Sequence, residues 1–380
     1  MSTASIKLKC GAFLAVVAAA SSPAMANADW TIKALGTLGG TTSFANGLNN
    51  LGQVVGYSYT AGDTIKNAFI TGANGSGMTS LGTLGGTMSE ARSINNSGHV
   101  VGWAYSAGSN DRHAFITGPN GKGMTSLSIG DGTISEASSI NDARQVVGWS
   151  RSAGSNAANG FITGPDGKGI TPLNGLVGAD RSILPLDINN TGQVTGFSWV
   201  GLGTDERAFI TGPNGAGITS LGTLGTGPFS YSYGLSINNS GQVVGSSSTN
   251  SGDSAFITRP NGTGMTSLSF LGGIHGVASG INDQGQVVGW ADTAQGTTDA
   301  FFFSDGNMTD LSVAPSIVEA GWTNLKPAAI NDEGQIAGYG TLYGSEQAFL
   351  LSPIPEPETY AMFLAGLGLM GFIARCKKVA

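Results

Sequence analysis

Two acidic pairs are the residues of this chain best suited to acid–base chemistry. Glu90 and Glu136 precede two expected strands in neighbouring copies of a repeat, and Asp205-Glu206 lies in a polar loop. Glycoside cleavage needs two carboxyl groups flanking the scissile bond. Loop carboxylates of this kind are usually solvated, and a sequence does not give the distance between them. We therefore treat glycoside cleavage as the alternative to a non-enzymatic function.

The remaining candidates for chemistry are sparse. His99 and His113 fall in expected strands and His275 in a loop between repeats, and none has a His or Cys partner at zinc-site spacing. The sequence contains no nucleophile elbow, phosphate loop or dinucleotide fingerprint. Three isolated Asp-Gly pairs indicate turns rather than calcium ligands. We therefore predict no catalytic, cofactor-binding or metal-binding residue, and no enzyme activity.

The elements that would position these residues come from one phrase that occurs seven times. One copy begins at Ile94 and reads Ile-Asn-Asn-Ser-Gly-His-Val-Val-Gly. The first Asn of the copies falls at 49, 95, 141, 189, 238, 282 and 331. Steps of 44 to 49 residues indicate one supersecondary unit copied along the chain. The body is therefore scaffold, and function is expected where the copies differ.

Each copy except the seventh contains four short apolar segments separated by turn residues. In the second copy they are 91–95, 99–104, 113–117 and 124–127. No stretch of the body keeps a 3.6-residue apolar period, so we expect no helix there. The pattern predicts an all-β fold, a seven-bladed β-propeller of four-stranded antiparallel blades over residues 29–353. A β-solenoid is the rival fold.

The ends of the body favour the closed ring. The seventh copy lacks a fourth strand, and residues 30–35 form an unassigned strand before the first copy. We expect residues 30–35 to pair with residues 347–351 and close the last blade, which also hides two sheet edges. The first strand of each blade then lies nearest the axis.

The connections between strands fall into two classes. The turns after the first and third strands are nearly uniform, whereas the loops after the second strand and between blades vary in length and charge. In an up-and-down blade the variable loops emerge on one face, here called the variable face, and the turns emerge on the opposite, uniform face. Any ligand surface should lie on the variable face, although drift of exposed loops explains the variation equally well.

An aromatic residue follows the glycine that ends the repeated phrase in six of the seven copies. Such a row could be a platform for carbohydrate, but packing of one blade on the next is favoured. The same packing is expected of the recurring Ala-Phe pairs. The six aromatic residues are Tyr57, Trp103, Trp149, Phe197, Trp290 and Tyr339.

Composition excludes some partners. Residues 29–353 carry 22 acidic and 12 basic side chains, a difference of −10. An acidic surface argues against nucleic acid and anionic lipid as partners. Both cysteines, Cys10 and Cys376, lie outside the body, so its stability comes without disulfides.

Both ends of the chain read as sorting signals. Residues 1–26 combine Lys7 and Lys9, a short apolar run and the small residues Ala24 and Ala26, which predicts a secretory signal peptide cleaved there. Residues 354–380 contain Pro355, Glu356 and Pro357, then an apolar run from 360 to 374 and a basic end. This run predicts a single hydrophobic helix of about 22 Å that anchors the protein in the membrane until the tail is processed.

The tail resembles the PEP-CTERM sorting domain of Gram-negative bacteria. The resemblance implies processing by an exosortase near Pro355–Pro357 and an association with extracellular polysaccharide and biofilm. Through its Ala-Phe-Ile and Ile-Asn-Asn-x-Gly-Gln-Val-Val-Gly phrases, the body resembles the HAF family of extracellular repeats, which implies location rather than chemistry. Only one copy spells His113-Ala114-Phe115 in full.

These observations predict a non-enzymatic exported protein. It would be tethered transiently to the membrane, then reach the cell surface or extracellular matrix and bind polysaccharide or a surface protein through the variable face. A secreted carbohydrate-active enzyme or lectin is the alternative. A sensor ectodomain is a weaker third hypothesis.

Overall fold

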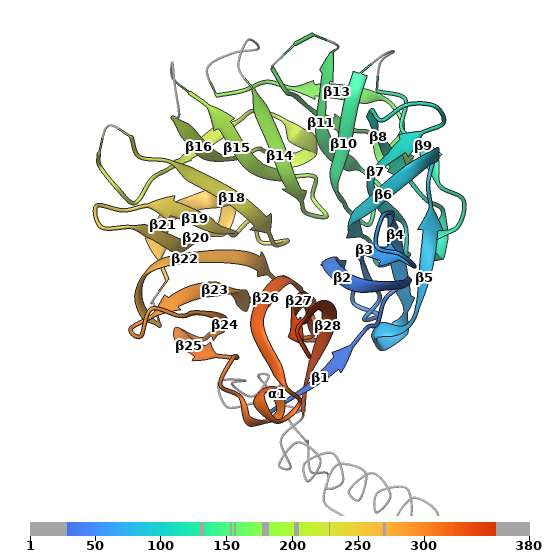
Figure 1. Cartoon of the computed structure of the whole chain (residues 1–380). Helices are drawn as coiled ribbons and strands as arrows, with labels where there is room; N and C mark the ends of the chain where they lie inside the picture. The colour runs from blue at the N-terminus through green and yellow to red at the C-terminus, as the bar shows by residue number, and fades with distance from the viewer. Residues whose placement is uncertain are drawn as a thin grey trace, which may run out of the picture.

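The chain folds as a ring of seven four-stranded antiparallel sheets, each forming one blade (Figure 1). The computed structural model describes residues 29–129, 133–152, 154–155, 157–176, 182–200, 205–227, 229–268 and 271–354. The predicted seven-bladed propeller is confirmed, and the solenoid is excluded. The first strands of all seven blades line a central channel, as expected.

The strands follow the copies in order, four to a blade. Blade 1 is β2 (Gly39–Leu48), β3 (Val54–Thr60), β4 (Lys66–Gly72) and β5 (Ser76–Gly82). Blade 2 is β6 (Gly85–Ile94), β7 (Val100–Ser106), β8 (Arg112–Ile116) and β9 (Thr125–Ser126). Blade 3 is β10 (Thr133–Ile140), β11 (Val146–Ser152), β12 (Asn159–Thr163) and β13 (Ile170–Leu173). Blade 4 is β14 (Ile183–Ile188), β15 (Val194–Trp199), β16 (Glu206–Ile210) and β17 (Thr219–Gly222).

The remaining blades repeat this arrangement. Blade 5 is β18 (Ser232–Ile237), β19 (Val243–Ser248), β20 (Asp253–Arg259) and β21 (Thr263–Ser267). Blade 6 is β22 (Gly272–Ile281), β23 (Val287–Thr293), β24 (Thr298–Ser304) and β25 (Asn307–Asp310). Blade 7 is β26 (Trp322–Ile330), β27 (Ile336–Leu342), β28 (Ser345–Pro353) and, from the start of the chain, β1 (Trp30–Ala34).

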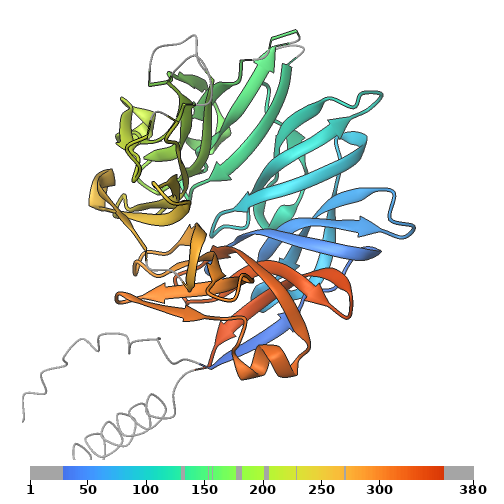
Figure 2. The ribbon, with the colours of Figure 1, turned by 60° about the vertical axis from the view of Figure 1, so that its left-hand side comes forward.

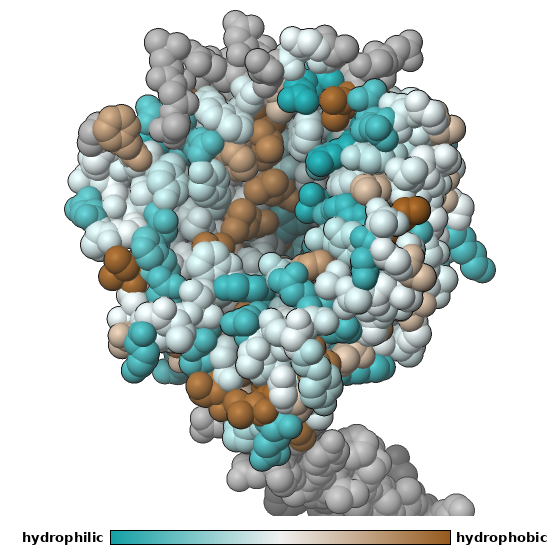
Figure 3. All heavy atoms as spheres, viewed as in Figure 1, coloured by the Kyte–Doolittle hydropathy of each residue, from teal (hydrophilic) through white to brown (hydrophobic). Residues whose placement is uncertain are grey.

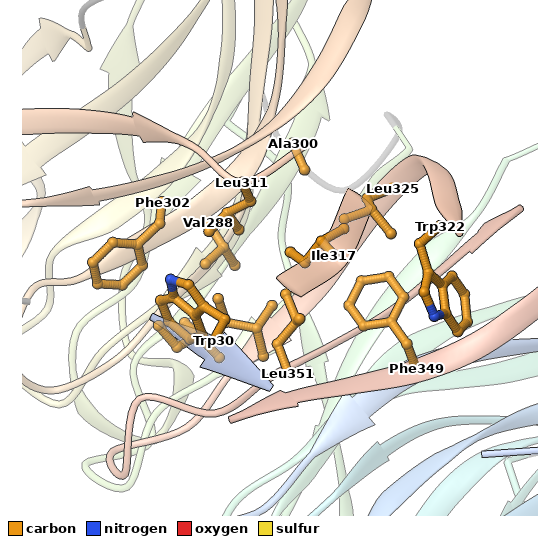
Figure 4. Packing of buried hydrophobic residues seen from close by; sticks show 12 residues of the cluster. Trp30, Val288, Ala300, Phe302, Leu311, Ile317, Trp322, Leu325, Phe349 and Leu351 are labelled. Carbon is orange, nitrogen blue, oxygen red and sulfur yellow. The ribbon is translucent and has the colours of Figure 1, made fainter. Parts of the chain in front are cut away.

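The pairing of β1 with β28 closes the ring, which confirms the strand pairing expected from the sequence. The register runs from Trp30 opposite Pro353 to Ala34 opposite Phe349. Figure 2 shows β1 in blue beside β28 in red. Trp30 is 2% exposed and packs edge-on against Phe302 of blade 6, with the two ring centroids 5.4 Å apart (Figure 4). The first strand therefore completes one blade and also its contact with the preceding blade.

The glycine of each Val-Val-Gly phrase is required by a bulge in the neighbouring first strand. The register shifts by one residue in the inner hairpin of every blade, for example between Ala91 and Ser93. The bulge brings the Glu90 carbonyl oxygen to 2.0 Å from where a side chain on Gly102 would begin. Corresponding glycines meet a carbonyl oxygen at 1.9 to 2.3 Å in the other six blades. Only glycine fits there, because any Cβ would overlap the backbone.

The hydrophobic core is divided among the contacts between blades. Seven buried clusters each join two adjacent blades. The Phe of each Ala-Phe pair is at most 2% exposed, which confirms the packing role expected of these pairs. Because each blade packs only on its neighbours, the ring can exceed the size that one shared core supports.

The repeated Asn residues form two rings of hydrogen bonds on the uniform face. The first Asn of each phrase donates its side-chain N–H to the backbone carbonyl of the same Asn in the next blade, at 2.9 to 3.1 Å, and the seventh returns to the first. In the second ring the residue after this Asn donates its backbone N–H to the side-chain oxygen of its counterpart, at 2.8 to 3.1 Å. The phrase thus ties the blades to one another.

The expectation of a body without helix was wrong at one place. The loop between blades 6 and 7 contains α1 (Pro315–Glu319), a single turn that starts at a proline and buries Ile317 completely. One turn is too short to leave a periodic pattern in the sequence. Within the described residues, no helix has the length and apolar character needed to cross a membrane. Ala24, Ala26, Pro355–Pro357 and the expected hydrophobic helix all lie outside the described residues.

Candidate functional site

The channel opens on the variable face into a cavity of about 490 Å³ with two unlike walls. One wall carries Leu184, Leu186 and Leu235 of blades 4 and 5, and the other carries charged residues of blades 2 and 3. Figure 3 shows the central hollow with hydrophobic residues over β14 and β18 and hydrophilic residues opposite. The walls differ because the first strands differ at these positions, while the surrounding scaffold repeats.

The charged wall is a ladder of ion pairs that crosses three blades. Lys66 Nζ lies 2.7 Å from Glu90 Oε2, and Arg92 Nη1 lies 3.0 Å from Glu90 Oε1. Arg92 Nη2 lies 3.9 Å from Glu136 Oε2, and Arg112 forms an ion pair with the other Glu136 oxygen. Three cations thus hold two carboxylates, which leaves the ladder one positive charge in excess. We call these five residues the charged ladder.

The structure corrects the placement of the carboxylates predicted from the sequence. Glu90 and Glu136 lie inside β6 and β10 rather than before them, and they are 5% and 7% exposed. The first strands begin earlier than expected. The structure therefore brings Glu90 and Glu136 together through Arg92, as buried partners of cations rather than solvated loop charges.

Aromatic rings surround the cations of the ladder. Lys66 Nζ lies 4.3 Å from the centroid of the Tyr57 ring and 5.0 Å from that of Trp103, and Arg112 lies 4.6 Å from the Trp103 ring. Burial, followed by the charge of Glu90, raises the pKa of Tyr57 to about 12. Trp103 is 2% exposed, and its indole N–H finds no acceptor among the described residues.

The row of aromatic residues therefore has a mixed role. Trp103 is buried between cations, whereas Tyr57, Phe197 and Tyr339 are half-buried, and Trp149 lines the cavity. The packing role favoured from the sequence holds for Trp103, and also for Tyr339 and Phe197, whose rings lie 4.9 Å from those of Phe44 and Tyr233 in the next blade. Trp149 is half-buried at the cavity, which leaves its platform role open.

The other acidic pair predicted from the sequence lies apart from the ladder, at the contact between blades 4 and 5. Glu206 is the first residue of β16 and accepts a hydrogen bond from the Tyr233 hydroxyl. The neighbouring Tyr231 hydroxyl donates to Asp253, and this hydrogen bond, followed by burial, raises the pKa of Tyr231 to about 12. Asp205 is half-buried in the preceding loop.

A single carboxylate lies deeper in the channel. Asp187 replaces the Gly, Ser or Ala of the other blades and lines a cavity of about 270 Å³. Its two oxygens accept hydrogen bonds from Ser139 and Ser236 at 2.8 and 3.0 Å, and from the backbone N–H of Ile188 and Ile237 at 2.9 Å. Burial raises the pKa of Asp187, and these four hydrogen bonds oppose the shift.

The sequence analysis misplaced two of the three histidines. His99 lies in the turn before β7 rather than in a strand, and His275 lies within β22 rather than in a loop. His113 is in β8, as expected. The described residues contain no group of three His, Cys, Asp or Glu side chains that could hold a metal ion.

Sequence reasoning missed the cations of the site. Arg92 and Arg112 were available in the sequence, but each is one of 12 basic residues of the body. Arg112 meets Glu136 across a separation of 24 residues, so no local motif marks the pair. One signal was present, because Arg92 occupies a position that is uncharged in the other copies.

Two family comparisons bear on the chain. Residues 230–347, which span most of blades 5 to 7, match the family described as protein of unknown function DUF3466. Residues 353–378 match the PEP-CTERM protein-sorting motif. The chain carries an exosortase sorting signal. The motif implies an exported protein that an exosortase processes and that is sorted to the envelope or surface of a Gram-negative cell.

No curated protein matches the chain, but solved structures share its fold. An oligogalacturonate lyase in complex with manganese is 12% identical, with a TM-score of 0.55 over 86% of this chain and 97% of the lyase. A puromycin hydrolase is 12% identical, with a TM-score of 0.54 over 80% of this chain and 50% of the hydrolase. The β-propeller domain of the trilobed protease from Pyrococcus furiosus is 8% identical, with a TM-score of 0.51 over 83% of this chain and 98% of that domain. These identities support the fold alone.

Proposed function

We propose that this protein is a non-enzymatic surface or matrix component that binds extracellular polysaccharide at the channel mouth on its variable face. The observation that carries the proposal is the cavity of about 490 Å³, with a tryptophan, leucines and charged side chains around it. Its size falls within the range of about 300–1,000 Å³ typical of ligand sites. The resemblance of the repeats to HAF repeats agrees with a location outside the cell.

The first and last described residues lie together on the uniform face. β28 begins at the β27–β28 loop on the variable face and ends at Pro353 on the uniform face. Ile354 donates its backbone N–H to the Asp29 carbonyl at 2.7 Å, so both ends leave the ring together on the uniform face. A tether that follows residue 354 would therefore attach to the face opposite the cavity.

The charged ladder supports binding rather than catalysis. A glycosidase needs one carboxyl group free to give a proton and another free to act as base or nucleophile. Here both Glu90 and Glu136 are occupied by cations. The second candidate function is a secreted carbohydrate-active enzyme, favoured by the presence of two carboxylates in one site and by the likeness to an oligogalacturonate lyase.

The test offers the purified protein a panel of soluble polysaccharides in affinity electrophoresis, and measures release of oligosaccharide in parallel. We expect retardation without release, and weaker retardation for Trp149→Ala than for Asn190→Ala on the uniform face. Release of oligosaccharide that disappears in Glu90→Gln or Glu136→Gln would favour the enzyme. No retardation by any polysaccharide would reject the binding function.

A further inference from the structure

We infer that the channel mouth selects polysaccharides that carry carboxylate groups, such as chains of uronic acids. The inference rests on the proposed function and names the ligand class of the same cavity. The site would hold a sugar carboxylate at Arg92 and Arg112, and the sugar ring between Trp149 and the leucine wall.

The first argument is the incomplete use of Arg92. A guanidinium group offers five N–H donors in a planar fork. Within the described part of the chain, Arg92 contacts Glu90 at 3.0 Å and Glu136 at 3.9 Å, and the second distance exceeds hydrogen-bond length. Its side chain is 41% exposed and lines both the cavity and the channel. Arg92 therefore keeps donors free for an acceptor in the cavity, and a carboxylate matches its fork.

The second argument is the sign of the local charge. The cavity wall holds Arg92 and Arg112 against one carboxylate, Glu136. The body as a whole carries ten more acidic than basic residues. An anionic polymer is repelled by such a molecule in general, so an excess of positive charge at the mouth directs it to this place.

The third argument is the shape and polarity of the rest of the wall. Trp149 offers an aromatic face, and Leu184, Leu186 and Leu235 offer apolar surface. Asn46 and Ser138 add small polar groups where the cavity meets the deeper channel. A pyranose ring has an apolar face and a hydroxyl-bearing edge, so it can use all three kinds of surface at once.

The test compares polygalacturonate with the same polymer after its carboxyl groups are reduced to alcohols. Affinity for the purified full chain is measured by affinity electrophoresis, at low and at raised salt. We expect the reduced polymer to bind at least about ten-fold more weakly, and raised salt to weaken binding of the acidic form only.

Matched arginine variants assign the effect to the site. Arg92→Gln should weaken binding of polygalacturonate about ten-fold, as expected for loss of a charge-assisted contact. Arg92→Lys should weaken binding by a smaller factor, because lysine keeps the positive charge but lacks the planar fork of donors. Arg144→Gln is the control, since Arg144 has a similar side-chain exposure of 44% and pairs with Asp166 away from the cavity. Arg112→Gln serves as the second variant if Arg92→Gln does not fold.

The outcomes separate the inference from the proposed function. Equal binding of the acidic and reduced polymers, with loss in Trp149→Ala, would overturn acid selection and leave polysaccharide binding intact. Unchanged binding of polygalacturonate to both Arg92→Gln and Arg112→Gln would also overturn it. If only neutral polysaccharides of the panel bind, the inference fails and the proposed function stands.

Discussion

At the scale of residues, the seven copies differ most in what they place in the channel. The phrase itself supplies Asn side chains that bind backbone groups and Gln side chains that bind other Asn side chains, and the sequence displays both without revealing these bonds. The residues just before it, such as Arg92 and Asp187, are where one copy departs from the rest. Glu136 lies one blade away from Arg92, and Ser139 and Ser236 lie one blade away from Asp187 at separations of 48 and 49 residues, so the sequence alone does not pair them.

Asp187 should make the stability of the protein depend on pH. Burial raises its folded-state pKa above the ordinary 3.8, so the folded protein holds a proton that the unfolded chain has released. The contribution of Asp187 to the free energy of unfolding should therefore fall as pH rises from 3.8 through the raised pKa. We expect wild type to lose stability relative to Asp187→Ser across this window in urea unfolding.

The serine variant is the appropriate comparison because three other blades carry Ser at this position, namely Ser93, Ser139 and Ser236. Removing the carboxylate there keeps a side chain that the scaffold already accommodates. A stability difference between the two proteins that stayed constant, or grew, with rising pH would contradict the assignment.

At the scale of elements, the strand pattern was predictable and its irregularities were not. Short segments between turns predicted four strands per copy, because β-branched residues and Gly-rich turns alternate clearly. The bulge in each first strand was not predicted, since it depends on how two strands meet. It explains why a glycine recurs in the second strand, whereas the sequence showed only that it recurs.

Two glycines of blade 6 test this explanation. A Cβ on Gly289 would meet the Val277 carbonyl oxygen at 2.0 Å, whereas one on Gly276 would find its nearest neighbour at an ordinary 3.5 Å. We expect Gly289→Ala to lower the free energy of unfolding by about 3 kcal/mol, and Gly276→Ala to change it by about 0.5 kcal/mol or less. Thermal and urea unfolding measure both. Equal effects of the two substitutions would show that the bulge is not what requires glycine at position 289.

At the scale of the whole molecule, ring closure was predictable because an unpaired strand and an unfilled place stood at opposite ends of the sequence. The rings of hydrogen bonds and the distribution of the core among blade contacts were not, because they arise only once the circle exists. The place of Asp29 and Ile354 on the uniform face follows from strand direction within blade 7.

A protein lacking residues 29–34 tests the closure. β28 would then present an open edge, and the buried surface of Trp30 would be lost. We expect oligomers or aggregates in size-exclusion chromatography, and recovery of monomer when a peptide of residues 29–35 is added. As a point variant, Trp30→Ala should lose about 3–5 kcal/mol and the exposed Thr31→Ala much less. A truncated protein that stays monomeric and equally stable would refute this role.

The joining of β1 to β28 also sets an order of events during export. Thr31 and Ser352 are 321 residues apart, so in a chain that emerges from its N-terminus the first strand waits for almost the last. Until then, six blades can form while the seventh stays open. Completion of the circle thus comes only when the chain reaches the segment that matches the sorting motif, and a chain cut short before β28 would leave the last blade with an unfinished edge.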